Sequence, residues 1–169
     1  MPKYLIETKR LGLRLLKKED IDCLFELESD ADVQQFSPSG VKTYEQTKAA
    51  VNKFIFDYED KGLPCFFLFK LASDEFIGRA MFFIWTEDDI EVGYSLHKRF
   101  WGNGYATEML GLLLEWARTN INADYITACS EAANPASLRV LEKCGMEYYK
   151  KDIDEGVEYR CYRIKNRNV

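Results

Sequence analysis

The sequence predicts a mixed α/β fold in which one twisted, mostly antiparallel sheet is flanked by helices. Segments that alternate apolar and polar residues occur among segments whose apolar residues recur at helical spacing. The strands expected at 65–71, 76–85 and 90–96 are joined by short connections, which are typical of antiparallel pairs. Residues 90–129 then read as strand, helix and strand, the order of a parallel crossover. We expect about six or seven strands and about four helices, in a single domain over residues 1–169.

The first third of the chain predicts one strand and two helices. Leu11 to Leu16 carries leucines at alternate positions and predicts a strand. Residues 18–28 have an apolar helical face, whereas the polar stretch 29–40 contains proline and glycine and predicts a loop. Thr43 followed by Gln46 is a capping-box pattern, so a helix is expected to run from there to about residue 58.

A hairpin is expected next, formed by residues 65–71 and 76–85, with a bulge at Gly78. Residues 86–89 should turn the chain into the following strand. Lys42 and Arg79 are expected to be ordinary surface charges.

The second half has a regular succession of elements. The Pro-containing start of the later helix and the glycine at residue 145 match the usual helix start and stop residues. The expected elements are a strand at 90–96, a helix at 105–117, a strand at 125–129, a helix at 134–144, and a closing strand pair at 146–149 and 157–164.

The loop between the strand at 90–96 and the helix at 105–117 is suited to an anion. A helix start has backbone N–H groups without internal partners and carries partial positive charge. Gly102 and Gly104 permit close approach of a ligand, and Arg99 adds a positive charge. The spacing is neither that of a P-loop nor that of the dinucleotide fingerprint. The loop therefore predicts a phosphate or pyrophosphate site, with a simple tight connection as the alternative.

Composition excludes several classes of function. The chain has a formal net charge of −5, which disfavours nucleic-acid binding, and no apolar run approaches the length of a membrane span. No signal-peptide pattern stands at the N-terminus, so we expect a cytoplasmic protein. The five cysteines are dispersed and there is one histidine, so no metal site is expected, and the thiols should be buried and reduced.

Two blocks of the sequence match known motifs. Residues 91–94 (Glu-Val-Gly-Tyr) and 99–106 (Arg-x-x-Gly-x-Gly-Tyr-Ala) resemble an acetyl-CoA pyrophosphate motif, and residues 134–146 resemble an Asn-x-x-Ser…Lys-x-Gly-Phe segment. Both motifs are those of the GNAT superfamily of N-acetyltransferases, and the pair most resembles the branch that acetylates ribosomal-protein N-termini (RimJ/RimL-like). The resemblance implies the GNAT acyltransferase fold, acetyl-CoA as cofactor, and an amine acceptor such as a protein N-terminus, a polyamine or an antibiotic. It also implies a monomer or a homodimer.

The resemblance assigns cofactor contacts along the chain. Backbone groups at the end of the strand expected at 90–96 would bind pantetheine and the thioester carbonyl, and Asn134 would bond pantetheine in addition to its N-cap role. The expected cofactor-binding residues are Leu96, His97, Arg99, Gly102, Asn103, Gly104, Tyr105, Ala106, Thr107 and Asn134.

The catalytic residues are less strongly indicated. Glu91 is the first candidate for the base that deprotonates the amine, with His97 and Glu131 as alternatives. The competing interpretation of Glu91 is a solvated strand position that alternates with Ile90 and Val92. His97 stands beside two basic residues and reads as a surface residue. Ser137 would protonate the leaving thiolate, or is simply a first-turn serine.

Three hypotheses about function follow. The first is an acetyl-CoA-dependent N-acetyltransferase that acts by direct attack in a ternary complex, because no Cys/His pair suggests a covalent intermediate. The second is a non-catalytic CoA-binding module on the same fold. The third is an unrelated phosphate-binding fold.

Overall fold

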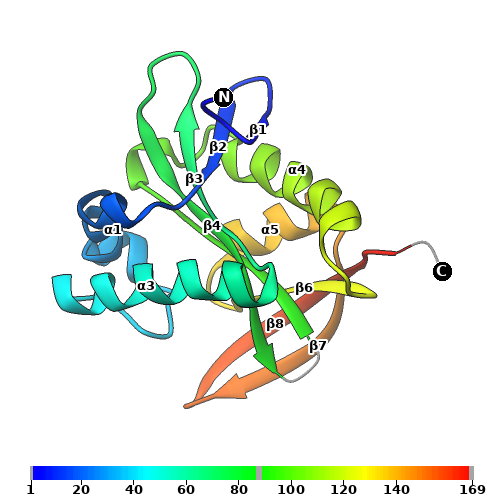
Figure 1. The fold of residues 1–169 in the computed structure, drawn as a ribbon. Helices are drawn as coiled ribbons and strands as arrows, with labels where there is room; N and C mark the ends of the chain where they lie inside the picture. The colour runs from blue at the N-terminus through cyan, green and yellow to red at the C-terminus, as the bar shows by residue number, and fades with distance from the viewer. Residues whose placement is uncertain (1, 87–88, 168–169) are drawn as a thin grey trace. The chain divides into compact units, whose positions relative to one another are not determined.

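The computed structural model describes residues 2–86 and 89–167, and over these ranges it contains eight strands and five α-helices (Figure 1). The strands form one sheet in the order β1-β2-β3-β4-β5-β6-β8-β7. The strands are β1 (Ile6–Glu7), β2 (Leu11–Leu15), β3 (Cys65–Lys70), β4 (Phe76–Thr86), β5 (Asp89–Leu96), β6 (Tyr125–Glu131), β7 (Glu147–Asp154) and β8 (Val157–Lys165). The α-helices are α1 (Ile21–Glu28), α2 (Ala31–Gln34), α3 (Tyr44–Lys61), α4 (Tyr105–Asn120) and α5 (Pro135–Lys143).

The predicted fold class is confirmed, with additions at the short elements. The pairs β1–β2, β2–β3, β3–β4, β6–β8 and β7–β8 are antiparallel, and β5–β6 is parallel. The extra elements are the two-residue β1 and the four-residue α2, which lies inside the predicted loop 29–40. Both are too short to show a periodic pattern. The expected turn at 86–89 lies partly outside the described residues.

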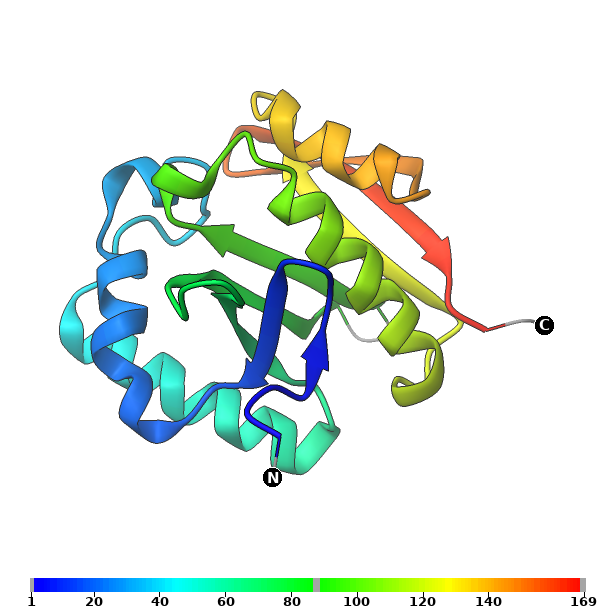
Figure 2. The same cartoon turned by 90° about the horizontal axis from the view of Figure 1, so that it is seen from above.

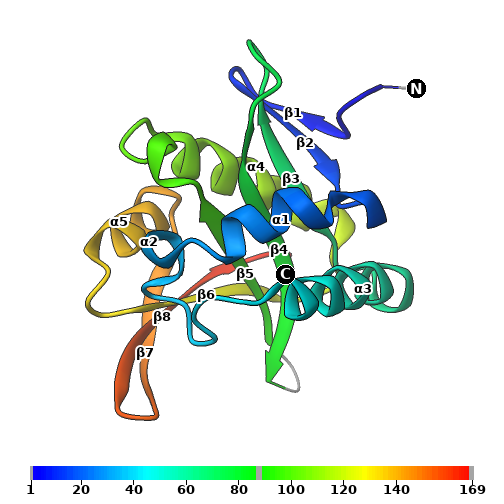
Figure 3. The same cartoon turned by 90° about the vertical axis from the view of Figure 1, so that its left-hand side faces the viewer.

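The chain divides into two compact parts, which are described separately. The first comprises Met1–Met81 and Tyr94–Tyr105. In it, α1 and α3 lie side by side (Figure 3). They pack on a cluster of buried apolar side chains contributed by Leu16, Leu24, Val51, Cys65 and Phe67. The capping box of α3 is present: the Gln46 amide donates to the Thr43 hydroxyl, and the Thr43 amide donates to the Gln46 side-chain oxygen.

The second part comprises Phe82–Gly93 and Ala106–Val169. Here α5 lies beside α4 (Figure 2), and the Cys144 thiol that follows α5 lies 3.5 Å from the Thr107 carbonyl oxygen of α4. Strands β7 and β8 form a long hairpin that turns at Glu155 and Gly156, both with positive φ. The expected closing strand pair is therefore confirmed, with β7 longer than predicted.

The β3–β4 pairing contains the irregularity that Gly78 predicted. The register shifts between Leu68 and Phe69, which pair with Gly78 and Phe76. A Cβ on Gly78 would lie 2.1 Å from the Ser95 carbonyl oxygen, so only glycine permits this approach of β5 to β4.

The cysteines differ from the expectation. Cys129 and Cys161 face each other across β6 and β8 and form a disulfide, and Cys23 is exposed. Only Cys65 is a fully enclosed thiol among the described free cysteines, and burial raises its pKa to about 12. Sequence spacing could not reveal the pair, because its members are brought together by strand pairing.

The expectation that Arg79 and Lys42 are surface charges is wrong. Arg79 is 7% exposed, and its Nε donates to Glu28 Oε1 at 2.7 Å. Lys42 also forms an ion pair with the Glu28 carboxylate. Burial raises the pKa of Glu28, but the two cations more than offset this, so the pKa lies below its ordinary value.

Candidate active site

The predicted anion loop lies between β5 and α4. A short 3-10 turn covers Lys98–Phe100, and α4 begins at Tyr105. Gly102 and Gly104 have φ of +75° and +77°, a conformation that glycine adopts at little cost. Over residues 2–86 and 89–167, the amides of Gly102, Asn103 and Gly104 have no hydrogen-bond acceptor. They are therefore donors available to an anion at a helix start.

The carbonyl oxygens of the same loop are held by protein donors. Asn103 Nδ2 donates to the carbonyls of Phe100 and Trp101 at 3.1 and 3.0 Å. Arg10 Nη1 donates to the Asn103 carbonyl at 2.8 Å. The Asn103 side chain therefore organises the loop, so that only its backbone amide remains to contact an anion. Arg10 was not found by sequence analysis, since it precedes this loop by 93 positions and belongs to no local motif.

The backbone groups of Leu96 and His97, at the end of β5, already form hydrogen bonds within the protein. The His97 amide donates to the Ile77 carbonyl at 2.9 Å, and the His97 carbonyl accepts from the Phe100 amide. The Leu96 carbonyl accepts from the Trp101 indole at 2.9 Å. A carbonyl oxygen has two lone pairs and can accept more than one hydrogen bond, whereas the His97 amide hydrogen is already used.

The His97 side chain is buried, which corrects its interpretation as a surface residue. It is 8% exposed and lies edge-on to the Phe76 ring, with 5.6 Å between ring centroids. Burial and the nearby Arg99 charge lower its pKa, although Glu26 and Asp30 act in the opposite direction. The imidazole is therefore neutral at neutral pH.

Glu91 is a buried carboxyl group, not a solvated strand residue. It is 6% exposed, and burial, followed by the neighbouring Asp89 charge, raises its pKa to about 7. A hydrogen bond from the Cys129 backbone and the charge of Lys150 act in the opposite direction. A carboxyl group with this pKa exchanges its proton readily near neutral pH, as a general base must.

Glu91 lies where β5 and β6 cease to pair. The parallel register joins Ile90 to Ile126 and Glu91 to Thr127. The Thr127 hydroxyl donates to the Ile90 carbonyl at 3.2 Å. In the described chain, neither Val92 nor Gly93 has a β6 partner, so the Glu91 carboxyl meets the Cys129 backbone beyond the last paired residues.

The N-terminus of α5 confirms the capping role of Asn134. Its Oδ1 accepts a hydrogen bond from the Ser137 amide at 3.3 Å. Pro135 occupies the first helical turn and Gly145 adopts φ of +84° after the helix, as their positions predicted. The cap uses the side-chain oxygen of Asn134, so its Nδ2 hydrogens still have donor capacity. Ser137 is half-buried on the first turn.

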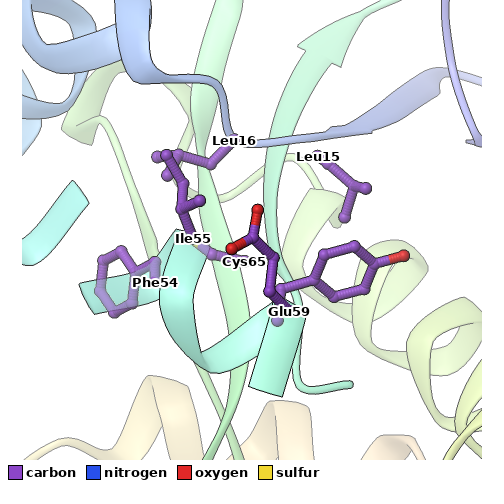
Figure 4. A pocket seen from close by; sticks show the side chains of 7 residues that line it. Leu15, Leu16, Phe54, Ile55, Glu59 and Cys65 are labelled. Carbon is purple, nitrogen blue, oxygen red and sulfur yellow. The ribbon is translucent and has the colours of Figure 1, made fainter. Parts of the chain in front are cut away.

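Other features offer less chemistry. Glu131 is half-buried at the end of β6. An apolar hollow in the first part contains a single carboxylate, Glu59, among hydrophobic side chains (Figure 4). Its lining residues are Leu15, Leu16, Phe54, Ile55, Tyr58, Glu59 and Cys65. Among the described residues no group of three His, Cys, Asp or Glu could hold a metal ion, and no helix could cross a membrane.

The predicted site residues fall into two groups. Leu96, His97 and the loop 99–105 belong to the first compact part, where Arg10 joins them. Glu91, Asn134 and Ser137 belong to the second, as do Ala106 and Thr107 on the first turn of α4. The first group can hold an anion through amides and cations, and the second contains a carboxyl group suited to proton transfer.

Comparison with known proteins identifies the family. The model of the acetyltransferase (GNAT) domain matches residues 10–147. The uncharacterized N-acetyltransferase YnaD of Bacillus subtilis (strain 168) is 33% identical over 158 residues, which cover 91% of each chain. A crystal structure of a GNAT-family acetyltransferase from Bacillus anthracis is 28% identical, with a TM-score of 0.80 over 95% of this chain and 98% of that one.

A RimL structure confirms the resemblance at the level of the fold. RimL, described as a ribosomal L7/L12 α-N-protein acetyltransferase in complex with coenzyme A, has a TM-score of 0.82 over 96% of this chain and 98% of its own, at 18% identity. The hypothesis of an unrelated phosphate-binding fold is therefore wrong. The extent of the family match, together with the strand, glycine loop and helix at the site, shows that this chain belongs to the GNAT family of acetyltransferases.

Proposed function

We propose that this protein transfers the acetyl group of acetyl-CoA to a primary amine by direct attack in a ternary complex. The observation that carries the proposal is the loop before α4, whose unpartnered amides and positive side chains suit a diphosphate. Acetyl transfer also requires a group that accepts a proton near neutral pH, and Glu91 has the pKa for this role.

The cofactor contacts follow from the loop's chemistry. The amides of Gly102, Asn103 and Gly104 bind the diphosphate, and those of the first turn of α4, from Tyr105 to Thr107, extend the same row. Arg99 is exposed and adds positive charge. The carbonyls of Leu96 and His97 accept hydrogen bonds from the pantetheine amides, and Asn134 Nδ2 donates to pantetheine.

The reaction moves three protons. Glu91, as carboxylate, takes the first from the acceptor ammonium directly or through a water molecule, which leaves the amine lone pair free. The nitrogen attacks the thioester carbon and becomes cationic, it loses its second proton to water, the C–S bond breaks, and the thiolate leaves. Ser137 donates the proton that converts the thiolate to free CoA, and bulk water then restores the hydroxyl proton.

Glu91 is favoured over His97 as the base. Its pKa of about 7 places a substantial carboxylate fraction at neutral pH while keeping it more basic than an ordinary glutamate. The His97 ring packs on Phe76 and its pKa is lowered, which weakens it as a base. The acceptor is a protein N-terminus, a polyamine or an antibiotic amine.

The test combines binding with turnover. Calorimetry with CoA measures the cofactor site, and thiol release from acetyl-CoA measures transfer to a panel of N-terminal peptides, polyamines and aminoglycosides. We expect CoA binding and thiol release with at least one class. Binding of CoA without turnover on any amine would support the non-catalytic module instead. Absence of CoA binding would contradict both readings.

A further inference from the structure

Arg10 lies in the turn between β1 and β2, where its backbone is fixed by two sets of hydrogen bonds. The Thr8 hydroxyl accepts from the amides of Arg10 and Leu11 at 3.3 and 2.9 Å. The Arg10 carbonyl accepts from the Leu71 amide, which follows β3, at 2.9 Å. The origin of this side chain is therefore held by the sheet, and not only by its own turn.

The Arg10 guanidinium makes two contacts with the anion loop. Nη1 donates to the Asn103 carbonyl at 2.8 Å, and the guanidinium carbon lies 4.4 Å from the centroid of the Tyr105 ring. A Cβ on Gly104 would lie 3.4 Å from Nη2. A planar cation that stacks on an aromatic ring while donating from its edge has few alternative positions.

The contact with the Asn103 carbonyl determines where the next amide points. A trans peptide is planar, and its C=O and N–H bonds point in opposite directions on either side of the C–N bond. The carbonyl oxygen of Asn103 and the N–H of Gly104 therefore point away from each other. Because Arg10 holds the oxygen, the Gly104 N–H is directed away from Arg10 and toward the side on which a diphosphate would bind. Without this restraint, a loop with two glycines at positive φ can sample many other peptide orientations.

We propose that Arg10 is a positioning residue for the CoA diphosphate. It holds the Asn103–Gly104 peptide in the orientation that binds the anion, and its charge lowers the cost of placing a diphosphate at the loop. It takes no part in acetyl transfer. This inference rests on the proposed function, since it concerns the same cofactor site.

The experiment compares Arg10→Gln and Arg10→Lys with the matched control Lys9→Gln. Lys9 is the exposed neighbour in the same turn, so its variant has the same net charge as Arg10→Gln without a change at the loop. CoA dissociation constants, KM for acetyl-CoA, kcat at saturation and urea midpoints are measured for each protein.

We expect Arg10→Gln to weaken CoA binding and raise KM for acetyl-CoA roughly 10- to 50-fold, the loss typical of a charge-assisted hydrogen bond. The saturating kcat should stay within about two-fold of the wild type, and Lys9→Gln should resemble the wild type. Arg10→Lys should remain within about three-fold of Arg10→Gln, because an ammonium cannot both stack and donate from a fixed edge. Wild-type affinity in Arg10→Lys would show that charge alone acts and would overturn the positioning role.

Shortened donors separate positioning from a general loss of structure. S-acetylpantetheine lacks the diphosphate, so its kcat/KM should be the same in wild type and Arg10→Gln. Dephospho-CoA retains the diphosphate, so it should suffer the same loss as CoA. Equal losses for all three donors, or a loss that disappears with dephospho-CoA, would overturn the proposal. If the wild-type protein binds no CoA, the proposed function itself fails, and this outcome is recognised before any variant is made.

Discussion

Two glutamates, one in each compact part, are nearly equally buried, yet their pKa values are shifted in opposite directions. Glu28 at the end of α1 is 1% exposed and Glu91 on β5 is 6% exposed. Burial is the largest influence on both and raises the pKa of each. Arg79 and Lys42 flank Glu28 and bring its pKa below the ordinary value, whereas Glu91 has Asp89 nearby and a pKa of about 7.

The difference shows that burial alone does not make a carboxyl group functional. A buried carboxylate between two cations is ionised at all physiological pH values and holds elements together. A buried carboxyl group whose neighbours do not offset the cost of desolvation keeps its proton affinity near neutrality, which is a frequent property of catalytic acids and bases. The same amino acid is therefore one member of a buried ion-pair cluster in one part and the proposed base in the other.

The largest effect should come from Glu28→Gln, which leaves the buried Arg79 without a negative partner. At pH 7 we expect the free energy of unfolding to fall by about 3 to 5 kcal/mol, as measured by urea denaturation. Because the pKa of Glu28 is lowered in the folded state, its contribution is present above the ordinary pKa of 4.5 and is lost as the pH falls through the folded value. The difference between variant and wild type should therefore shrink at acid pH.

A double variant provides the control. Glu28→Leu combined with Arg79→Met removes both buried charges and should recover most of the lost stability, since apolar groups of similar volume often replace buried pairs. A pH-independent loss in Glu28→Gln would instead attribute its effect to packing.

The second largest effect should be the loss of acetyl-transfer activity in Glu91→Gln. Glu91→Gln retains an oxygen that can accept the Cys129 bond but cannot take a proton, so kcat should fall about 100-fold or more. In the wild type, kcat should rise with pH through an apparent pKa near 7. The pH profile of Glu91→Gln should lack this rising limb. Steady-state rates between pH 5.5 and roughly 9 with the true acceptor measure both.

Glu131→Gln distinguishes the alternative base on β6. A large loss in that variant with a small loss in Glu91→Gln would move the base to Glu131. Unchanged CoA affinity in Glu91→Gln is required for either result to report on the chemical step.

The same substitution at Glu91 should affect stability in the opposite direction to Glu28→Gln. The folded pKa of about 7 lies above the ordinary 4.5, so the folded state binds more protons between these values. The free energy of unfolding of the wild type therefore decreases as the pH rises through this window. Glu91→Gln removes that decrease and should be more stable by about 2 kcal/mol at pH 8, with no such gain below pH 4.5, by urea denaturation. If Glu91→Gln is less stable than the wild type at pH 8, burial of the Glu91 carboxylate does not destabilise the folded state as inferred.

The geometry of the glycine loop at residues 99–105 was predictable from the sequence because its determinants are local. A strand pattern, two glycines and an apolar helical face stand within 30 residues, and the structure places β5, the positive-φ glycines and α4 accordingly. Chain order also predicted the parallel β5–β6 pair.

The missed contacts are between residues distant in sequence. Arg10 and Asn103 are 93 positions apart, and Glu28 and Arg79 are 51 apart. Neither pair has a sequence spacing that marks it, because strand pairing and helix packing bring the partners together. Glu91 was identified as a candidate base by its place in a motif, but its burial and pKa depend on the Cys129 backbone and residues of β7, which the strand pattern alone does not specify.

The smallest effect tests whether Asp89 helps to set the proton affinity of Glu91. Its negative charge is the second cause of the raised pKa, after burial, so Asp89→Asn should shift the acid limb of the kcat profile downward by roughly half a pH unit. The side-chain oxygen of asparagine can still accept the bond from the Thr86 hydroxyl. Lys150→Met is the opposite control, because the Lys150 charge lowers the same pKa, and the limb should move upward in that variant. If the pH limb of both variants stays at the wild-type position, the charges of Asp89 and Lys150 do not set the proton affinity of Glu91, and burial dominates it. The contrast with Glu28 would then lie only in the two cations that Glu28 possesses and Glu91 lacks.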